Sequence, residues 1–294
     1  MSADGIAVER SGGPDRRAER AAAARRTARR GQLIAAVSTV VVLGGMATLV
    51  ATSPGWPEVR DTFFSWEQFR DSFPEIFDAF WLDVRVFLVV EVAVLILGLA
   101  VALVRTVTLP ALFPLRILAI VYTDLFRGIP TILLVYLIGF GVPALATATE
   151  EGGSTPLSWL PTEPVVLGGI ALALSYGAYV AEVYRAGINS IHPGQRHAAL
   201  AVGLNERQAL RHVIIPQAVR RIGPPLLNDF IALQKDVALI AIIGVSGEAF
   251  RTAQVQVAAE FNYTPLVAAA LLYLAITVPM ARLLDRWERG RARS

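Results

Sequence analysis

The 294-residue sequence contains no cysteine and a single lysine, Lys235. Without cysteine, disulfide bonds and thiolate metal ligands are excluded. Because Asp236 follows the lysine, the chain has no Gly-Lys-Ser/Thr phosphate-binding loop, so any ATP that it depends on is bound by another polypeptide. The sequence also lacks the motifs G-x-S-x-G and H-E-x-x-H and any paired intramembrane aspartates, which argues against an intramembrane enzyme.

Charged residues are scarce, at 17%, whereas hydrophobic residues make up 54% of the chain. Several apolar runs reach the roughly 20 residues that a helix needs to cross a hydrocarbon core of about 30 Å. We therefore predict an all-α integral membrane protein with about six transmembrane helices. The predicted spans cover residues 32–52, 84–104, 128–147, 164–183, 222–244 and 265–284. An apolar segment at 112–126 approaches the third span and is expected at the membrane interface.

The placement of arginine predicts how these spans are oriented. The tail before the first span, the loop 185–221 and the tail 282–294 are arginine-rich, and they fall on one side when six spans are assigned. On the opposite side, the loop 53–83 holds seven acidic residues against two arginines, and the loop 148–163 holds three acids and no base. We expect a multi-pass protein of the inner or plasma membrane with both termini in the cytoplasm.

The residues outside the main spans give a predicted division of the chain. Residues 1–31 are polar and arginine-rich, and we expect a disordered cytoplasmic tail rather than a cleaved or twin-arginine signal. Residues 32–82 add a first transmembrane helix and an external amphipathic segment with an aromatic stripe, for which the alternative is an ordinary interfacial belt. Residues 83–286 form the main transmembrane domain, including the loop 185–221, and 287–294 form a cytoplasmic tail. The stripe consists of Trp66, Phe69, Phe73, Phe77 and Phe80, with Pro74 placed to open a second helical turn.

The arginine-rich loop carries clear helix signals. Residues 195–202 favour a helix that Gly203 ends, because glycine readily adopts the left-handed conformation just past a helix end. Asn205, followed three residues later by a glutamine, then caps a second helix over 206–215, which Pro216 stops. The pattern predicts two short helices joined by a tight turn and presented to a soluble partner. The alternative is an amphipathic loop that lies on the lipid surface.

This loop resembles the cytoplasmic coupling motif of ABC importer permeases, written E-A-A, three residues, G, nine residues, I-x-L-P. Four positions match at the spacing of the motif: Ala198, Ala199, Gly203 and Pro216. Three positions depart from it: His197 replaces glutamate, Val213 replaces isoleucine and Ile215 replaces leucine. The resemblance implies that these seven residues form the ATPase-coupling loop, in which His197 removes a carboxylate from the contact.

The flanking segments are similar to polar amino acid permeases of the histidine, glutamine, glutamate and arginine type. Residues 122–130, Y-T-D-L-F-R-G-I-P, resemble the segment Y-x-E-x-x-R-G-T-P. Residues 178–188 and 190–195 resemble the stretch before the coupling motif. Residues 224–228 resemble the element P-P-L-x-N, and residues 233–236 resemble the start of L-x-K-D-T-S-L, in which Val237-Ala238 replaces the usual threonine-serine pair. The resemblance covers about residues 83–286. It implies a five-helix ABC importer permease core plus one extra N-terminal helix.

By this resemblance, the chain is the permease subunit of an ATP-driven importer of a polar amino acid and not an enzyme. The implied partners are a dimer of ATP-binding subunits, a second permease subunit that is identical or paralogous, and an external substrate-binding protein. Membrane lipid surrounds the chain, and no cofactor or nucleic acid is expected. An ion-coupled secondary transporter is the competing class, but such folds usually carry inverted repeats, and the two halves here show none.

Several charged residues and one proline-containing bend are candidates for a substrate path or gate. Lys235 and Asp236 lie within the fifth predicted span, where a charge at the bilayer centre costs about 2.5–3.5 kcal/mol. Arg127, together with Gly128 and Pro130, marks a place where a helix bends and frees backbone carbonyls. Glu182 is a similar intramembrane charge. The alternatives are a structural pair that snorkels to the interface and a purely structural kink.

The three histidines lie in the arginine-rich loop. They are His192, His197 and His212. Their spacing matches no standard ligand motif and no carboxylate pattern completes it, so we predict no metal site.

Overall fold

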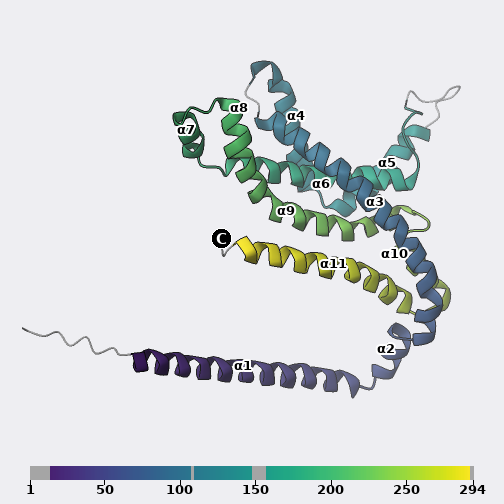
Figure 1. Cartoon of the computed structure of the whole chain (residues 1–294). Coiled ribbons are helices and arrows are strands. Elements are labelled where there is room, and N and C mark those ends of the chain that lie inside the picture. Colours follow the sequence, from purple (N-terminus) through teal and green to yellow (C-terminus); the bar gives the residue numbers. More distant parts are fainter. Residues whose placement is uncertain (1–13, 107–108, 148–156, 292–294) are drawn as a thin grey trace, which may run out of the picture. The chain divides into compact units, whose positions relative to one another are not determined.

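The computed structural model describes the backbone of residues 14–106, 109–147 and 157–291, and the side chains from residue 30 onward. Within these residues the regular structure is entirely helical (Figure 1), which confirms the predicted all-α membrane fold. Four described helices are long and apolar enough to cross a membrane. They are α1 (Pro14–Ala51), α3 (Trp66–Thr106), α6 (Pro164–Asn189) and α11 (Thr264–Arg291).

A fifth crossing results if α4 (Phe113–Gly128) and α5 (Thr131–Thr147) count as one broken span. The two helices are bent by 107° at the break between them, so the segment is either a broken span or a re-entrant loop. The short 3-10 helix η1 (Pro110–Leu112) precedes α4. The apolar segment expected at 112–126 is therefore a helix in its own right, set at a steep angle to the next one.

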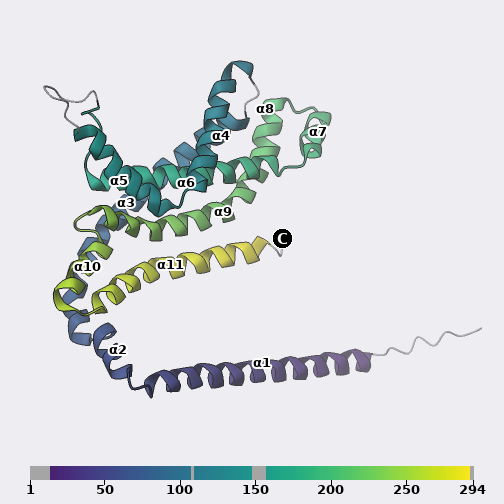
Figure 2. The same ribbon diagram turned by 180° about the vertical axis from the view of Figure 1, so that it is seen from behind.

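The predicted span at 222–244 is divided between two elements. α9 (Ile215–Asp236) is followed by the 3-10 helix η3 (Val237–Ile243), which ends where Gly244 adopts a left-handed conformation with φ of 80°. α9 does not reach the apolar character of the four long helices because it carries several charged side chains. It packs between α6 and α11 (Figures 1 and 2).

Residues 1–61 form one compact unit, in which α1 is followed by the short α2 (Trp56–Phe63). α1 begins at Pro14, within the residues 1–31 for which a disordered tail is predicted, and residues 1–13 lie outside the described part of the chain. Alanine and arginine favour a helix, and proline suits its first turn. The span Arg30–Ala51 has a mean hydropathy of 2.3, as expected for a helix that crosses a membrane.

Residues 62–294 form the second unit, whose main core lies between α3, α6, α9 and η3. Lipid tails are as apolar as the core side chains, so close packing rather than hydrophobic exclusion holds such helices together. Two glycines of this core allow close approaches between helices. A Cβ on Gly98 of α3 would lie 2.6 Å from Val180 Cγ1, and one on Gly168 of α6 would lie 2.6 Å from Ile240 Cγ2. The core is formed by residues that include Val90, Val94, Leu172, Val180, Leu233 and Ile240.

The aromatic stripe is not a separate amphipathic segment, which corrects that prediction. α3 runs without a break from Trp66 to Thr106, and Pro74 lies inside it. Successive rings stack along the helix, with centroids of Trp66 and Phe69 5.7 Å apart and those of Phe69 and Phe73 5.2 Å apart. Phe69 and Phe73 also pack against α10 (Ala249–Glu260) and α11. Stacking and packing compensate for the single backbone donor that proline removes.

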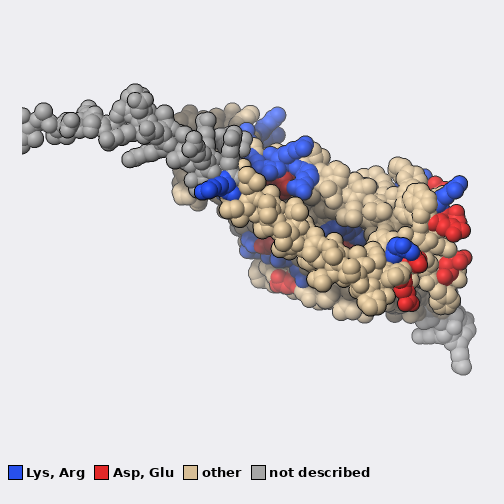
Figure 3. All heavy atoms as spheres, turned by 90° about the horizontal axis from the view of Figure 1, so that it is seen from below, with Lys and Arg blue, Asp and Glu red and all other residues tan. Residues whose placement is uncertain are grey.

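Acidic side chains gather at one end of the face that Figure 3 shows, with basic side chains among them. At the C-terminal end of the sequence, the tail predicted at 287–294 overlaps the last helix. α11 continues as a helix to Arg291, and residues 292–294 lie outside the described part.

Candidate functional site

The two helices predicted in the arginine-rich loop are present. α7 (Pro193–Ala201) is followed by Gly203 in a left-handed conformation with φ of 92°, as expected for the end of a helix. Asn205 then caps α8 (Glu206–Ala209) with a complete capping box. The Asn205 Oδ1 accepts from the Gln208 N–H at 2.9 Å, and the Gln208 Oε1 accepts from the Asn205 N–H at 3.0 Å.

Pro216 does not stop the second helix, and that prediction is corrected. α8 passes into a π-helical turn, η2 (Leu210–Ile214), which continues directly into α9. Pro216 occupies the first turn of α9. A proline lacks a backbone donor and crowds the carbonyl four residues earlier, and the wider π turn just before it removes that conflict. The α7–α8 pair is therefore joined rigidly to α9 by continuous helix.

The residues of the coupling motif divide into exposed and buried positions. Ala199 is buried between the two helices, whereas the neighbouring positions of the motif face outward. The exposed residues of the motif are His197, Ala198, Gly203, Ile215 and Pro216, and Val213 is half-buried. Val202 is 79% exposed and Leu210 is 51% exposed, which adds two apolar side chains to this outer surface. Sequence reasoning missed Leu210.

An ion pair that the sequence did not predict closes the α7–α8 pair. The Arg196 Nη2 donates to the Glu206 Oε1 at 2.7 Å, and the Arg196 Nε donates to the Glu206 Oε2 at 2.9 Å. This two-pronged contact fixes the angle between the helices, although an exposed pair of this kind stabilises by only about 0–1 kcal/mol. His192, one of the three loop histidines, has a structural role, since its Nδ1 accepts from the Gly194 N–H at 3.0 Å as the N-cap of α7.

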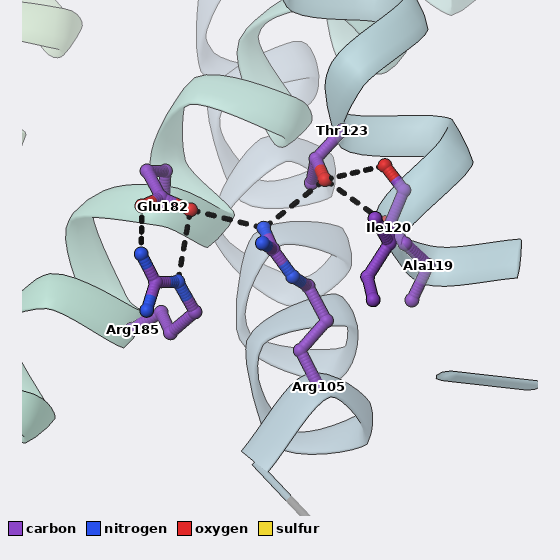
Figure 4. Close-up of polar contacts among 6 residues, drawn as sticks. All are labelled: Arg105, Ala119, Ile120, Thr123, Glu182 and Arg185. Carbon is purple, nitrogen blue, oxygen red and sulfur yellow. Dashed lines mark hydrogen bonds and ion pairs between the residues drawn. The ribbon is translucent and has the colours of Figure 1, made fainter. Parts of the chain in front are cut away.

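Glu182 is the centre of an ion-pair network that joins three helices (Figure 4). The Arg105 Nη1 of α3 donates to the Glu182 Oε2 at 2.9 Å and to the Thr123 Oγ1 of α4 at 3.0 Å. The Arg185 Nε donates to the Glu182 Oε2 at 3.0 Å, and its Nη2 donates to Oε1. Glu182 was singled out from the sequence, but its partners were not, because Arg105 lies 77 residues away in the chain.

The predicted bend at Arg127, Gly128 and Pro130 is confirmed as the break between α4 and α5. Gly128 is exposed, with nothing within 4 Å of the position that a Cβ would take. The Arg127 carbonyl accepts from the Tyr179 hydroxyl at 3.2 Å, and the Arg127 guanidinium lies 5.6 Å from the centroid of the Tyr179 ring. The Pro130 carbonyl accepts from the backbone N–H of Leu133 at 2.9 Å. One carbonyl at the bend, that of Arg127, is therefore bound by a side-chain donor from α6.

Arg127 and Glu182 line a shared cavity of about 360 Å³. Arg221 and Asp229 of α9 line it as well, although sequence reasoning did not select them. The Arg221 Nη1 donates to the Ser190 carbonyl at 2.7 Å, whereas the Asp229 Oδ2 is buried without a hydrogen-bond partner among the described residues. The cavity thus combines two guanidinium groups with two carboxylates. The charge of Asp229 inside the predicted fifth span was the signal that could have identified it.

Lys235 and Asp236 do not belong to the set of residues that line this cavity. They are the last two residues of α9. The Tyr176 hydroxyl of α6 donates to the Asp236 Oδ2 at 2.8 Å, whereas Lys235 is exposed. Across the described part of the chain, no group of three or more histidine, aspartate or glutamate side chains is arranged to hold a metal ion.

Comparison with known proteins supports a transport role. The arginine transport system permease protein ArtQ of Bacillus subtilis (strain 168) is 32% identical over 206 residues, which are 70% of this chain and 87% of that protein. The glutamine transport system permease protein GlnP of Escherichia coli (strain K12) is 35% identical over 172 residues, 58% of this chain and 73% of that protein. A crystal structure of an amino acid ABC transporter with histidines superposes with a TM-score of 0.62 at 29% identity, covering 74% of this chain and 94% of that one.

Residues 94–293 match the family of binding-protein-dependent transport system inner membrane components. This range includes both the α7–α8 pair and the cavity around Arg127 and Glu182. The chain belongs to this family, and it is a multi-pass membrane permease of the ABC importer type rather than an enzyme.

Proposed function

We propose that this permease imports a polar amino acid. The cavity around Arg127 and Glu182 carries the proposal. Its guanidinium groups suit the carboxylate of a free amino acid, and the Asp229 carboxylate suits the ammonium group. Asp229, whose Oδ2 is buried and unpartnered, is the natural acceptor for that ammonium group. The arginine and glutamine permeases named above support the same substrate class.

The α7–α8 pair serves, in this proposal, as the coupling surface for a dimer of ATP-binding subunits. Exposed apolar side chains at Val202 and Leu210 flank an exposed turn at Gly203, and such a surface suits a protein partner. Because α8 continues through η2 into α9, a displacement of the pair moves the helix that carries Arg221 and Asp229. ATP-driven closure of the partner subunits would thereby change the shape of the cavity.

The arrangement of the whole importer follows, in this proposal, from the orientation of the chain in the membrane. Both termini and the α7–α8 pair face the cytoplasm, where arginine-rich segments are retained. An external binding protein delivers substrate from the opposite side, where the acidic segment 53–83 lies. Residues 83–286 form the transport domain, and a second permease subunit, identical or paralogous, completes the path. Lys235 and Asp236, at the end of α9, lie near the external gate.

Uptake into sealed vesicles tests the substrate and the energy source together. The full-length chain is co-expressed with ATP-binding and permease subunits of its source organism, the external binding protein is supplied, and uptake of labelled arginine and glutamine is measured with and without ATP. We expect uptake only with ATP and the ATP-binding subunit. Uptake driven by an ion gradient without that subunit would instead identify a secondary transporter.

Two neighbouring arginines provide a matched test of the cavity. Both are exposed, but only Arg221 lines the cavity. Arg221→Gln should raise the substrate concentration for half-maximal uptake at least about tenfold, the equivalent of losing one charge-assisted hydrogen bond of about 1.5–3 kcal/mol. Arg220→Gln should change it little. Equal effects of the two substitutions would contradict a substrate role for this cavity.

A further inference from the structure

Two buried carboxylates meet one tyrosine hydroxyl where α3, α10 and α11 come together. Asp83 of α3 is 2% exposed, and Glu248, which precedes α10, is 0% exposed. The Tyr273 Oη of α11 lies 2.7 Å from the Asp83 Oδ2 and 3.2 Å from the Glu248 Oε1. None of these three residues lines the cavity around Arg127 and Glu182. The cluster therefore needs an explanation that the transport path does not supply.

Glu248 has the surroundings of an ionised carboxylate. Its Oε1 accepts from the Phe250 N–H at 2.9 Å, and its Oε2 accepts from the Arg251 N–H at 2.7 Å. It is the N-cap of α10, a helix of 12 residues, so the helix dipole also favours a negative charge there. Both oxygens are satisfied without any added proton.

Asp83 lacks comparable support for a negative charge. Its Oδ1 is buried and has no hydrogen-bond partner among the described residues, and the backbone N–H of Ala249 lies 3.4 Å from its Oδ2. No lysine or arginine in the described part of the chain forms an ion pair with Asp83 or Glu248. Asp83 also lines a cavity of about 180 Å³, where α9 contributes the uncharged Gln234. The other side chains around that cavity are apolar: Phe80, Val84, Phe87, Leu88, Phe230, Ile276 and Met280.

The number of protons available for hydrogen bonds distinguishes the two carboxylates. Tyr273 has one hydroxyl proton and can donate it to only one of them. If both acids were ionised, the carboxylate that does not receive the Tyr273 proton would face the Tyr273 oxygen with no proton between them. A second negative charge would also be buried without a counter-charge. If Asp83 carries a proton on Oδ2, it donates to the Tyr273 Oη, and Tyr273 in turn donates to the Glu248 Oε1. This chain of donors satisfies both short contacts with a single negative charge.

We propose that Asp83 binds a proton in this conformation and that the Asp83–Tyr273–Glu248 cluster is a buried proton site joining α3 to α10 and α11. The ligand is a proton rather than a metal cation, because backbone N–H groups, which repel cations, are directed at Glu248. The charged and titratable groups that face Asp83 are Glu248 before α10 and Tyr273 on α11; α9 presents only Gln234. Loss of the proton adds a second negative charge and weakens this junction.

Infrared difference spectroscopy tests the proposal directly. The full-length chain, purified with its partner subunits in lipid nanodiscs, should show the carbonyl stretch of a protonated carboxylic acid at neutral pH. We expect this band to disappear in Asp83→Asn and to persist in Asp78→Asn, which removes an exposed carboxylate from the same helix. Tyr273→Phe should shift the band to higher frequency, because the acid loses its acceptor.

The pH dependence of stability provides a second measurement with a defined sign. If the folded protein holds a proton that the unfolded chain releases, the folded state loses stability as pH rises. For one proton, the unfolding constant rises by up to about tenfold per pH unit. The melting temperature of the wild type should therefore fall with rising pH, and Asp83→Asn should flatten this fall. The absence of an acid band at neutral pH, or a band that vanishes in Glu248→Gln but not in Asp83→Asn, would overturn the assignment. A melting temperature that follows sodium or potassium concentration rather than pH would also overturn it.

Discussion

The hydrogen bond between Tyr176 and Asp236 distinguishes two adjacent charges that the sequence presents as a pair. The Tyr176 hydroxyl donates to the Asp236 Oδ2 at 2.8 Å and ties the end of α9 to α6. A hydrogen bond to a charged group contributes about 1.5–3 kcal/mol. We expect Tyr176→Phe and Asp236→Asn each to lower the stability of the purified protein. The double variant should lose less than the sum, because Tyr176→Phe removes the same contact that Asp236→Asn weakens.

Lys235, the neighbour of Asp236, provides the matched comparison for the Asp236 substitution. It is exposed, and the described residues provide it with no hydrogen bond or ion pair. Lys235→Met keeps most of the side-chain stem and should leave the melting temperature unchanged while lowering transport turnover per assembled complex. If the stability losses of Tyr176→Phe and Asp236→Asn simply added up in the double variant, the contact between the two side chains would be refuted. Normal turnover in Lys235→Met would refute a role for Lys235 near the gate.

The turn between α7 and α8 is the element on which coupling depends in the proposed function. Gly203 has φ of 92°, and the space around it is open, so a side chain there is penalised by backbone conformation rather than by a clash. A left-handed residue other than glycine costs about 1–2 kcal/mol. Gly203→Asp should also place a charge on the surface offered to the ATP-binding subunits. We expect ATP hydrolysis to continue while transport per ATP falls.

Gly290 is the control for this substitution. It too has nothing within 4 Å of the Cβ position, but it lies near the end of α11 with an ordinary backbone conformation. Gly290→Asp should preserve the ratio of substrate transported to ATP hydrolysed. Transport at the normal rate in Gly203→Asp would contradict the proposed docking of the α7–α8 pair.

At the scale of single elements, the sequence predicted the features whose causes lie close together in the chain. The capping box at Asn205 and the left-handed Gly203 were predicted because their causes lie within a few residues. Pro216 was misjudged as the end of a helix because a π turn precedes it, and Pro74 was expected to open a second helical turn but lies inside α3. The Arg105 ion pair to Glu182 and the Asp83 cluster were not predicted, because their partners meet only after long stretches of chain have folded together.

At the scale of the whole molecule, the first unit is separable from the rest. Residues 1–61 form their own compact unit, and the side chains of the span Arg30–Ala51 are exposed within the structure. The family match begins at residue 94, well after this span. The five-helix core proposed for residues 83–286 therefore contains every residue of the cavity and of the α7–α8 pair. Its transport cycle has no evident requirement for α1.

Deletion of residues 1–52 tests this separation. Without α1 the new N-terminus must lie outside, so that the remaining spans still leave the α7–α8 pair in the cytoplasm, and insertion should become less efficient. We expect fewer inserted molecules but nearly unchanged uptake per assembled complex. Deletion of residues 1–29 is the control, because it removes arginines and keeps the span Arg30–Ala51. If the longer deletion alone abolished uptake in complexes that insert and assemble normally, α1 would belong to the transport machinery and the five-helix core would be incomplete.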